Sequence, residues 1–275
     1  MFTKGVQIMK QSKKRVLVSL VVLVLTVFAS TAWVGVAQAQ PKNIIFFIGD
    51  GMGFEHVKAA GYYTGATLSF ESFPYSGQVT TYSLNAGGSN PGATDSAAAG
   101  TALATGVKVN NGQVSMLEIN PGEWIELETL LEYFKDQGKM TGLVTTSFMT
   151  DATPAAFGAH DENRSHTDAI ADDYRLQTQP NVLFGGGGYG MTDWEFANAG
   201  YTVKKCWDVG RDDIPDEDGL KWLDTETETM VLGRFGTQEL PYEDDGLGDL
   251  PHLSEMAYTA LRILDNEPRW LFPDG

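Results

Sequence analysis

Apolar and polar residues follow two different periods along this chain, and the change of period predicts strands and helices in alternation. Short runs rich in apolar residues, typical of strands buried in a parallel sheet, occur at 42–48, 140–146 and 181–184. Helices are predicted over 96–105, 124–134 and 254–264, each from its composition, periodicity or end signals. This order of elements indicates an α/β fold.

Two stretches carry weaker patterns. Gly185–Gly190 satisfies the G-x-G-x-x-G pattern of dinucleotide-binding loops, but only a short helical stretch follows the last glycine, so we expect a loop that ends a strand. Residues 208–249 are dense in Asp and Glu and contain several glycines, which predicts an exposed loop region. The sequence shows no internal repeat and no clear second domain.

The N-terminal residues have the three parts of a secretory signal. Basic residues come first, an apolar run covers 16–28, and Ala37-Gln38-Ala39 offers a cleavage site of small residues. We therefore expect a signal segment over 1–39, an α/β domain over 40–275, and export to a periplasm or to the outside of the cell. The alternative is an uncleaved membrane anchor over 16–36.

Composition excludes some classes of function. Nineteen Lys and Arg residues stand against 36 Asp and Glu, giving a formal net charge of −17, so nucleic acid is not an expected partner. Cys206 is the single cysteine, which excludes an intrachain disulfide.

Candidate chemistry is found in three clusters. Asp50 follows the first predicted strand between two glycines, where an open α/β sheet presents ligands. Ser96 begins an alanine-rich helix, which leaves its hydroxyl free. Asp151 and Thr153 follow the second predicted strand; their oxygens suit Mg²⁺, and the guanidinium of Arg164 suits a phosphate. Taken singly, each residue could be only a turn, a helix cap or packing. Together they suggest a metal-activated serine nucleophile.

The same clusters resemble a known family. Residues 43–53, 94–106 with Val107-Lys108, and 151–164 look like successive signature segments of the alkaline phosphatases. The resemblance runs from about Pro41 to Leu264, and the T-D-S-A-A and D-A-T-P-A-A strings are its most specific parts. It implies a large, mostly parallel central sheet flanked by helices, usually in a homodimer.

The resemblance also implies roles and cofactors. Asp50 would bridge one of two zinc ions and a magnesium ion, and Ser96, with its oxygen held by zinc, would become phosphoserine. Asp151 and Thr153 would bind magnesium, and Arg164 would grip the phosphate oxygens. The implied cofactors are Zn²⁺ and Mg²⁺, and the implied substrates are small phosphomonoesters.

The C-terminal part departs from the family pattern. The family continues into an E-G-G strand end and D-x-x-x-H and further His ligands, whereas this sequence ends at Pro273-Asp274-Gly275. The four histidines, at positions 56, 160, 166 and 252, lie outside the family ligand motifs. We therefore expect a fold that is incomplete at the C-terminus and weak hydrolysis. A non-catalytic exported phosphate or magnesium binder is the main alternative, followed by a related phosphodiesterase or sulfatase.

Overall fold

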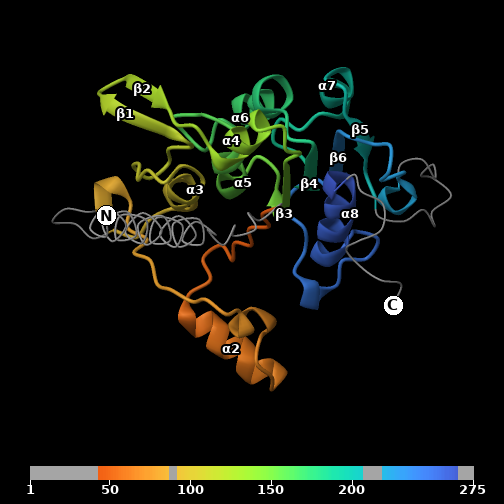
Figure 1. Ribbon diagram of the computed structural model, residues 1–275, viewed down its shortest axis with the longest axis horizontal. Helices are drawn as coiled ribbons and strands as arrows, with labels where there is room; N and C mark the ends of the chain where they lie inside the picture. The colour runs from red at the N-terminus through yellow and green to blue at the C-terminus, as the bar shows by residue number, and fades with distance from the viewer. Residues whose placement is uncertain (1–42, 87–91, 207–218, 266–275) are drawn as a thin grey trace, which may run out of the picture. The chain divides into compact units, whose positions relative to one another are not determined.

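The computed structural model describes residues 43–86, 92–206 and 219–265 (Figure 1). Its contacts divide the chain into two units, Met1–Gly49 and Asp50–Gly275. The predicted signal segment and the alternative anchor both lie outside the described residues. No helix in the described ranges is long and apolar enough to cross a membrane.

The strand predicted over 42–48 is wrong in this structure. Asn43–Gly49, the described part of the first unit, is irregular, and its apolar side chains are exposed, Phe47 at 74%. A strand exists only when a neighbouring strand completes its hydrogen bonds. Within the described ranges, no strand pairs with this segment. An apolar run alone is therefore not sufficient to predict a strand.

The second unit is built on a four-stranded parallel sheet, which confirms the α/β class. Its strands, in spatial order, are β3 (Gly142–Phe148), β4 (Val182–Gly186), β6 (Val231–Phe235) and β5 (Thr202–Lys204). Two of these strands lie where the apolar runs 140–146 and 181–184 predicted them. The loop predicted after the glycines follows at 187–190, and the next helix begins only at Asp193.

Two hydrophobic clusters fill the spaces between the sheet and the helices that cover it. Alternate residues of β4 belong to different clusters, as expected for a strand covered on both sides. Leu183 packs with residues of α5 (Ala152–Gly158) and α6 (Thr167–Asp173). Phe184 belongs to the cluster that contains Met256 and Ile263 of α8 (Leu253–Asp265). Helix α8, which the sequence predicted, packs against β3 and β4 (Figure 1).

The loop prediction for 208–249 is wrong in its central part. Residues 207–218 lie outside the described ranges, but Val231–Phe235 is β6, which pairs with both β4 and β5. The acidic residues around it occupy turns such as the 3₁₀ helix η6 (Glu243–Asp245). High charge density in the flanks hid a short buried strand.

The helix predicted over 124–134 is wrong in its first half. Strands β1 (Met116–Asn120) and β2 (Glu123–Glu126) form an antiparallel hairpin, and Gly122 between them has φ +78°. Helix α4 starts later, at Leu130–Asp136, because Thr129 caps it: its Oγ1 accepts a hydrogen bond from the Glu132 N–H at 3.2 Å. Cross-strand pairing overrides the helical spacing of this segment.

Helix α3 (Ser96–Thr105) is present as predicted, and it packs closely on α5. A Cβ on Gly100 would lie 2.9 Å from the Cβ of Ala156, so only glycine fits this approach. The close contact brings the N-termini of α3 and α5 near each other.

The remaining described helices are α2 (Phe54–Thr64), η1 (Ser69–Ser72), η2 (Leu84–Ala86), the π-helix η3 (Tyr174–Thr178), α7 (Asp193–Asn198) and η5 (Leu220–Trp222).

Candidate active site

Ser96 is the first residue of α3. Asp95 precedes it in extended conformation and caps the helix: its Oδ1 accepts a hydrogen bond from the Ala98 N–H at 2.9 Å. The helix ends at Gly106, which has the left-handed conformation common after a last helical turn. Because α3 is pinned by its cap and by packing on α5, the Ser96 hydroxyl has a defined position.

The carboxylate of Asp50 bridges two hydroxyl groups. Ser96 Oγ donates to Asp50 Oδ1 at 3.0 Å, and Thr153 Oγ1 donates to Asp50 Oδ2 at 2.7 Å. Asp50 is exposed and lies in a turn ahead of α2, where Gly51 adopts φ +65°. Thr153 lies in the first turn of α5. These four oxygens belong to three residues that lie 46 to 103 positions apart in the sequence.

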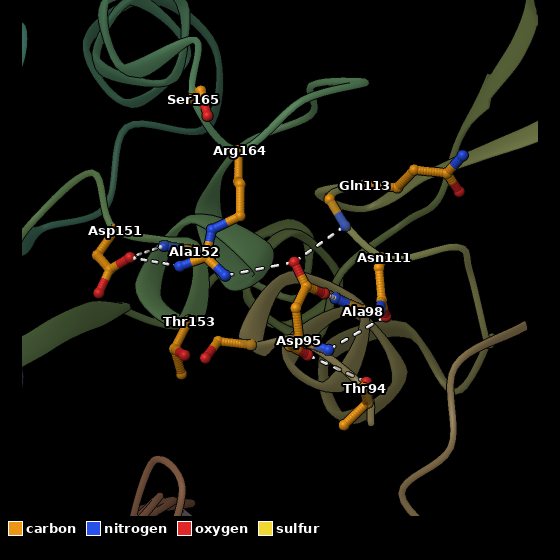
Figure 2. Close-up of polar contacts among 12 residues, drawn as sticks. Thr94, Asp95, Ala98, Asn111, Gln113, Asp151, Ala152, Thr153, Arg164 and Ser165 are labelled. Atoms are coloured by element: carbon orange, nitrogen blue, oxygen red, sulfur yellow. Dashed lines mark hydrogen bonds and ion pairs between the residues drawn. The ribbon is translucent and has the colours of Figure 1, made fainter. Parts of the chain in front are cut away.

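Arg164 bridges two carboxylates beside this group (Figure 2). Its Nη1 donates to Asp95 Oδ2 at 3.3 Å, and its Nη2 donates to Asp151 Oδ1 at 2.9 Å. The Arg164 backbone N–H donates to the Gly112 carbonyl at 2.8 Å. Asp151 is itself held by the Ala152 N–H at 2.7 Å. The Arg164 side chain keeps about a third of its surface exposed.

All five residues predicted from the sequence therefore lie in two adjoining networks. Asp50, Ser96 and Thr153 form one, and Asp151 and Arg164 belong to the other. Their roles stay predictions, because the contacts establish proximity and not chemistry. The sequence reasoning missed Asp95, which joins the networks by capping α3 and pairing with Arg164. Its position directly before the candidate serine was the available signal.

The donor set of this site consists of oxygens. Its carboxylate and hydroxyl oxygens are ligands that suit a hard cation such as Mg²⁺. The described histidines bond elsewhere: His160 to the Leu127 carbonyl, His166 to Asp161, His252 to Glu243, and His56 to the Gly53 N–H. Over the described ranges, no group of three or more His, Cys, Asp or Glu side chains could hold a metal ion.

His160 and Glu132 anchor the segment that leads to Arg164. His160 Nε2 lies 3.4 Å from Glu132 Oε2. Burial alone would lower the pKa of His160, but the hydrogen bond and charge of Glu132 outweigh it and raise that pKa. Burial would likewise raise the pKa of Glu132, but the hydrogen bonds from His160 and Thr129 lower it. Each group favours the charged form of the other.

Known proteins are similar to this chain over a range that includes the site residues. The family model for alkaline phosphatase matches residues 41–273. Alkaline phosphatase 3 of Bacillus subtilis is 35% identical over 253 residues, covering 86% of this chain and 50% of that protein. The chain thus spans about half the length of this relative.

Solved structures agree with the fold. The cold-active alkaline phosphatase of a psychrophilic Shewanella is 30% identical, with a TM-score of 0.60, and the match covers 80% of this chain and 52% of that one. A magnesium-bound variant of alkaline phosphatase from the Antarctic bacterium TAB5 is 24% identical, with a TM-score of 0.66 and coverage of 82% and 61%. The family match spans most of the sequence and includes the site, so this chain belongs to the alkaline phosphatase family.

Proposed function

We propose that the protein hydrolyses phosphomonoesters with Ser96 as the nucleophile. The observation that carries this proposal is the convergence of two hydroxyls on the Asp50 carboxylate, beside an arginine held by two further carboxylates. A partly exposed arginine and a partly exposed serine at the same site suit phosphoryl transfer, in which positioning and charge stabilisation dominate. Family membership supports the reaction class.

Arg164 supplies the charge for the phosphate. Each of its terminal nitrogens carries two hydrogens, and each donates one hydrogen bond to a carboxylate. One hydrogen on each nitrogen is left for bidentate contact with two phosphate oxygens. Asp95 and Asp151 would hold the planar fork in place, so that less side-chain entropy is lost when the phosphate binds.

Ser96 Oγ would attack phosphorus in line with the leaving oxygen. The Oγ–P bond forms, the bond from phosphorus to the alcohol oxygen breaks, and the Oγ proton passes along its hydrogen bond to Asp50 Oδ1. The departing alcohol oxygen takes a proton from water. The N-terminus of α3 favours negative charge at the first helical residues. Water would then attack phosphorus from the side that the alcohol has left. The P–Oγ bond breaks, Oγ regains the proton from Asp50, and inorganic phosphate is released.

The oxygens at this site fit magnesium. Asp50 and Thr153 would hold the ion, and Asp151 lies in the adjoining network. Mg²⁺ is commonly bound through one or two carboxylates with several retained waters, so no larger cage of acidic residues is needed. When bound, it would lower the repulsion between the carboxylates and the phosphate.

The described residues do not fit zinc. Zinc sites use about four nitrogen, sulfur or oxygen ligands, with histidine or cysteine prominent. The described histidines are engaged away from Ser96. The proposed reaction therefore has no step that uses zinc, although the family resemblance implies this metal.

Steady-state turnover tests the proposal. The protein, supplied with Mg²⁺, is expected to release phosphate from an aryl phosphate at alkaline pH, and Ser96→Ala is expected to lower kcat by at least about a thousandfold. Arg164→Ala should chiefly raise KM. Turnover that survives Ser96→Ala would contradict the proposal.

A second candidate is a protein that binds phosphate and magnesium without turnover, favoured by the same arginine and oxygen cluster. Calorimetry with inorganic phosphate distinguishes the two. Binding that depends on Arg164, with no hydrolysis under any metal condition, would favour the binder.

Export and dimerisation belong to the same proposal. Cleavage after Ala39 would leave a chain that begins at Gln40, which N-terminal sequencing of the exported protein tests. A homodimer, as the family resemblance implies, predicts twice the chain mass in light scattering.

A further inference from the structure

The side chain of Asn111 clamps the backbone that leads into the nucleophile helix. Its Oδ1 accepts a hydrogen bond from the Asp95 N–H at 3.1 Å, and its Nδ2 donates to the Ala93 carbonyl at 3.1 Å. Figure 2 shows the Asn111 side chain directed at Asp95, on the other side of Asp95 from Arg164. One planar amide thus fixes the two residues around Thr94, immediately ahead of Ser96.

This contact requires an amide side chain. Asn111 donates and accepts with the same flat group, which carboxylate, hydroxyl and aliphatic side chains of similar size do not reproduce at both ends. Aspartate would keep the acceptor for the Asp95 N–H, but it would place a second oxygen against the Ala93 carbonyl.

The turn that carries Asn111 is itself held from both sides. The Asn111 N–H donates to Asn85 Oδ1 at 3.3 Å, and the next N–H, of Gly112, donates to Asp95 Oδ2 at 3.0 Å. Gly112 has φ +91°, a conformation that favours glycine, and its carbonyl accepts the Arg164 N–H. The turn therefore contacts both the segment ahead of Ser96 and the backbone of Arg164.

We propose that Asn111 is a positioning residue for Ser96, an inference that rests on the proposed function. Asn111 is exposed and its bonds compete with water, so it adds little to global stability. Its bonds act on the peptide units directly ahead of the serine. Losing them lets the start of α3 rotate, which misaligns Oγ for in-line attack, while Arg164 keeps its shorter ion pair, to Asp151 at 2.9 Å.

The test compares Asn111→Ala with Asn110→Ala. The neighbour is a matched control because the bond it makes to Gln113 Oε1 uses its backbone N–H, which alanine retains. After rapid mixing with an aryl phosphate and an acid quench, mass spectrometry measures the rate at which Ser96 gains phosphate. We expect Asn111→Ala to slow this step about ten- to a hundredfold. The dissociation constant for inorganic phosphate should change less than about twofold, because Arg164 and its ion pair with Asp151 remain and the Asp95 carboxylate is still present.

Asn111→Asp provides a second variant of the same size, should alanine disturb folding. It should also slow phosphorylation of Ser96, because the bond to the Ala93 carbonyl is lost. Rates for both Asn111 variants equal to that of Asn110→Ala would overturn the proposal. So would equal losses in rate and phosphate affinity, the pattern of general unfolding.

A second readout separates this inference from the proposed function. If Ser96 of the wild-type protein gains no phosphate, the proposed function fails, and the clamp is judged by hydrogen exchange of the Asp95 amide. Faster exchange in Asn111→Ala than in Asn110→Ala would support the clamp. Equal exchange would overturn it.

Discussion

Helices α2 and α3 share the same kind of C-terminal end but have different surroundings. Each ends in a glycine of left-handed conformation, Gly65 and Gly106. Helix α3 buries five residues, including Gly100, in its contact with α5 and the core. Helix α2 buries none, and Tyr62 and Tyr63 are 88% and 84% exposed. Capping and periodicity define a helix, but only packing fixes its place.

The candidate site draws on both kinds of segment. Ser96 and Thr153 lie in the first turns of two helices that pack together, whereas Asp50 lies just ahead of α2. Asp50 is held to them by its two hydrogen bonds to hydroxyls. We therefore expect the nucleophile to be preorganised by the core, and Asp50 to depend on the polar contacts of the site itself.

The strongest test of this contrast replaces an interior glycine of each helix with leucine. Gly100→Leu forces side-chain atoms into the contact with Ala156 and should lower the free energy of unfolding by about 1–3 kcal/mol. Gly61→Leu, in α2, meets nothing closer than 3.7 Å at its Cβ and should raise that free energy by up to about 1 kcal/mol. Urea unfolding measures both. Similar losses at the two positions would contradict the packing difference.

Loss of the α3 cap should have the next largest effect. Asp95→Ala removes the acceptor for the Ala98 N–H and should cost about 1 kcal/mol of stability, measured by urea unfolding. It also removes a carboxylate partner of Arg164, so phosphate affinity should change as well. Asp95→Asn, which keeps a capping oxygen, is the control: it should recover most of the stability. If it is as unstable as the alanine variant, the cap is not the cause.

A smaller effect is expected from pH. The raised pKa of His160 means that its contribution to stability is present below the ordinary value of 6.5 and is lost as the pH rises through the raised value. The lowered pKa of Glu132 means that its contribution is present above 4.5 and is lost as the pH falls through the lowered value. Stability from this pair should therefore peak between these values and decline toward alkaline pH.

The measurement is the thermal midpoint across pH for His160→Gln against the wild type. His160→Gln should remove the decline, whereas His56→Gln, in the exposed α2, should leave it in place. An unchanged pH profile in His160→Gln would show that other groups cause the decline.

The smallest effect is expected at the N-cap of α2. Gly53 holds this position in extended conformation, and a Cβ there would meet only ordinary van der Waals contact with His56. Gly53→Ser should raise the stability of α2 by a few tenths of a kcal/mol, read from slower amide exchange in 54–64. Exchange within α3 should not change. If it slows in both helices, they form one cooperative unit and the contrast fails.

Local signals predicted local features well. The start of α3 and the span of α8 follow from capping and periodicity, and both are present. The strand expected over 42–48 failed because a strand depends on distant partners. The same dependence turned Trp124–Glu126 into a hairpin strand and concealed β6 among acidic turns.

The site divides in a similar way. Each predicted residue stands in a recognisable local pattern, but the meeting of Arg164 with Asp95 and Asp151 depends on how α3 and α5 pack. Asp95 and Asn111 act through long-range contacts: Asn111 binds the Asp95 N–H across 16 residues, and Asp95 pairs with Arg164 across 69 residues. No local pattern marks such contacts, so only the folded structure brings them into view.

The most direct test of the account is to find where phosphate resides during the reaction. The protein is mixed with an aryl phosphate and metal ions, quenched in acid, digested, and mapped by mass spectrometry. We expect phosphate on Ser96 of the wild-type protein and on no residue of Ser96→Ala. Turnover without phosphoserine at position 96, or phosphate attached to another side chain, would contradict it.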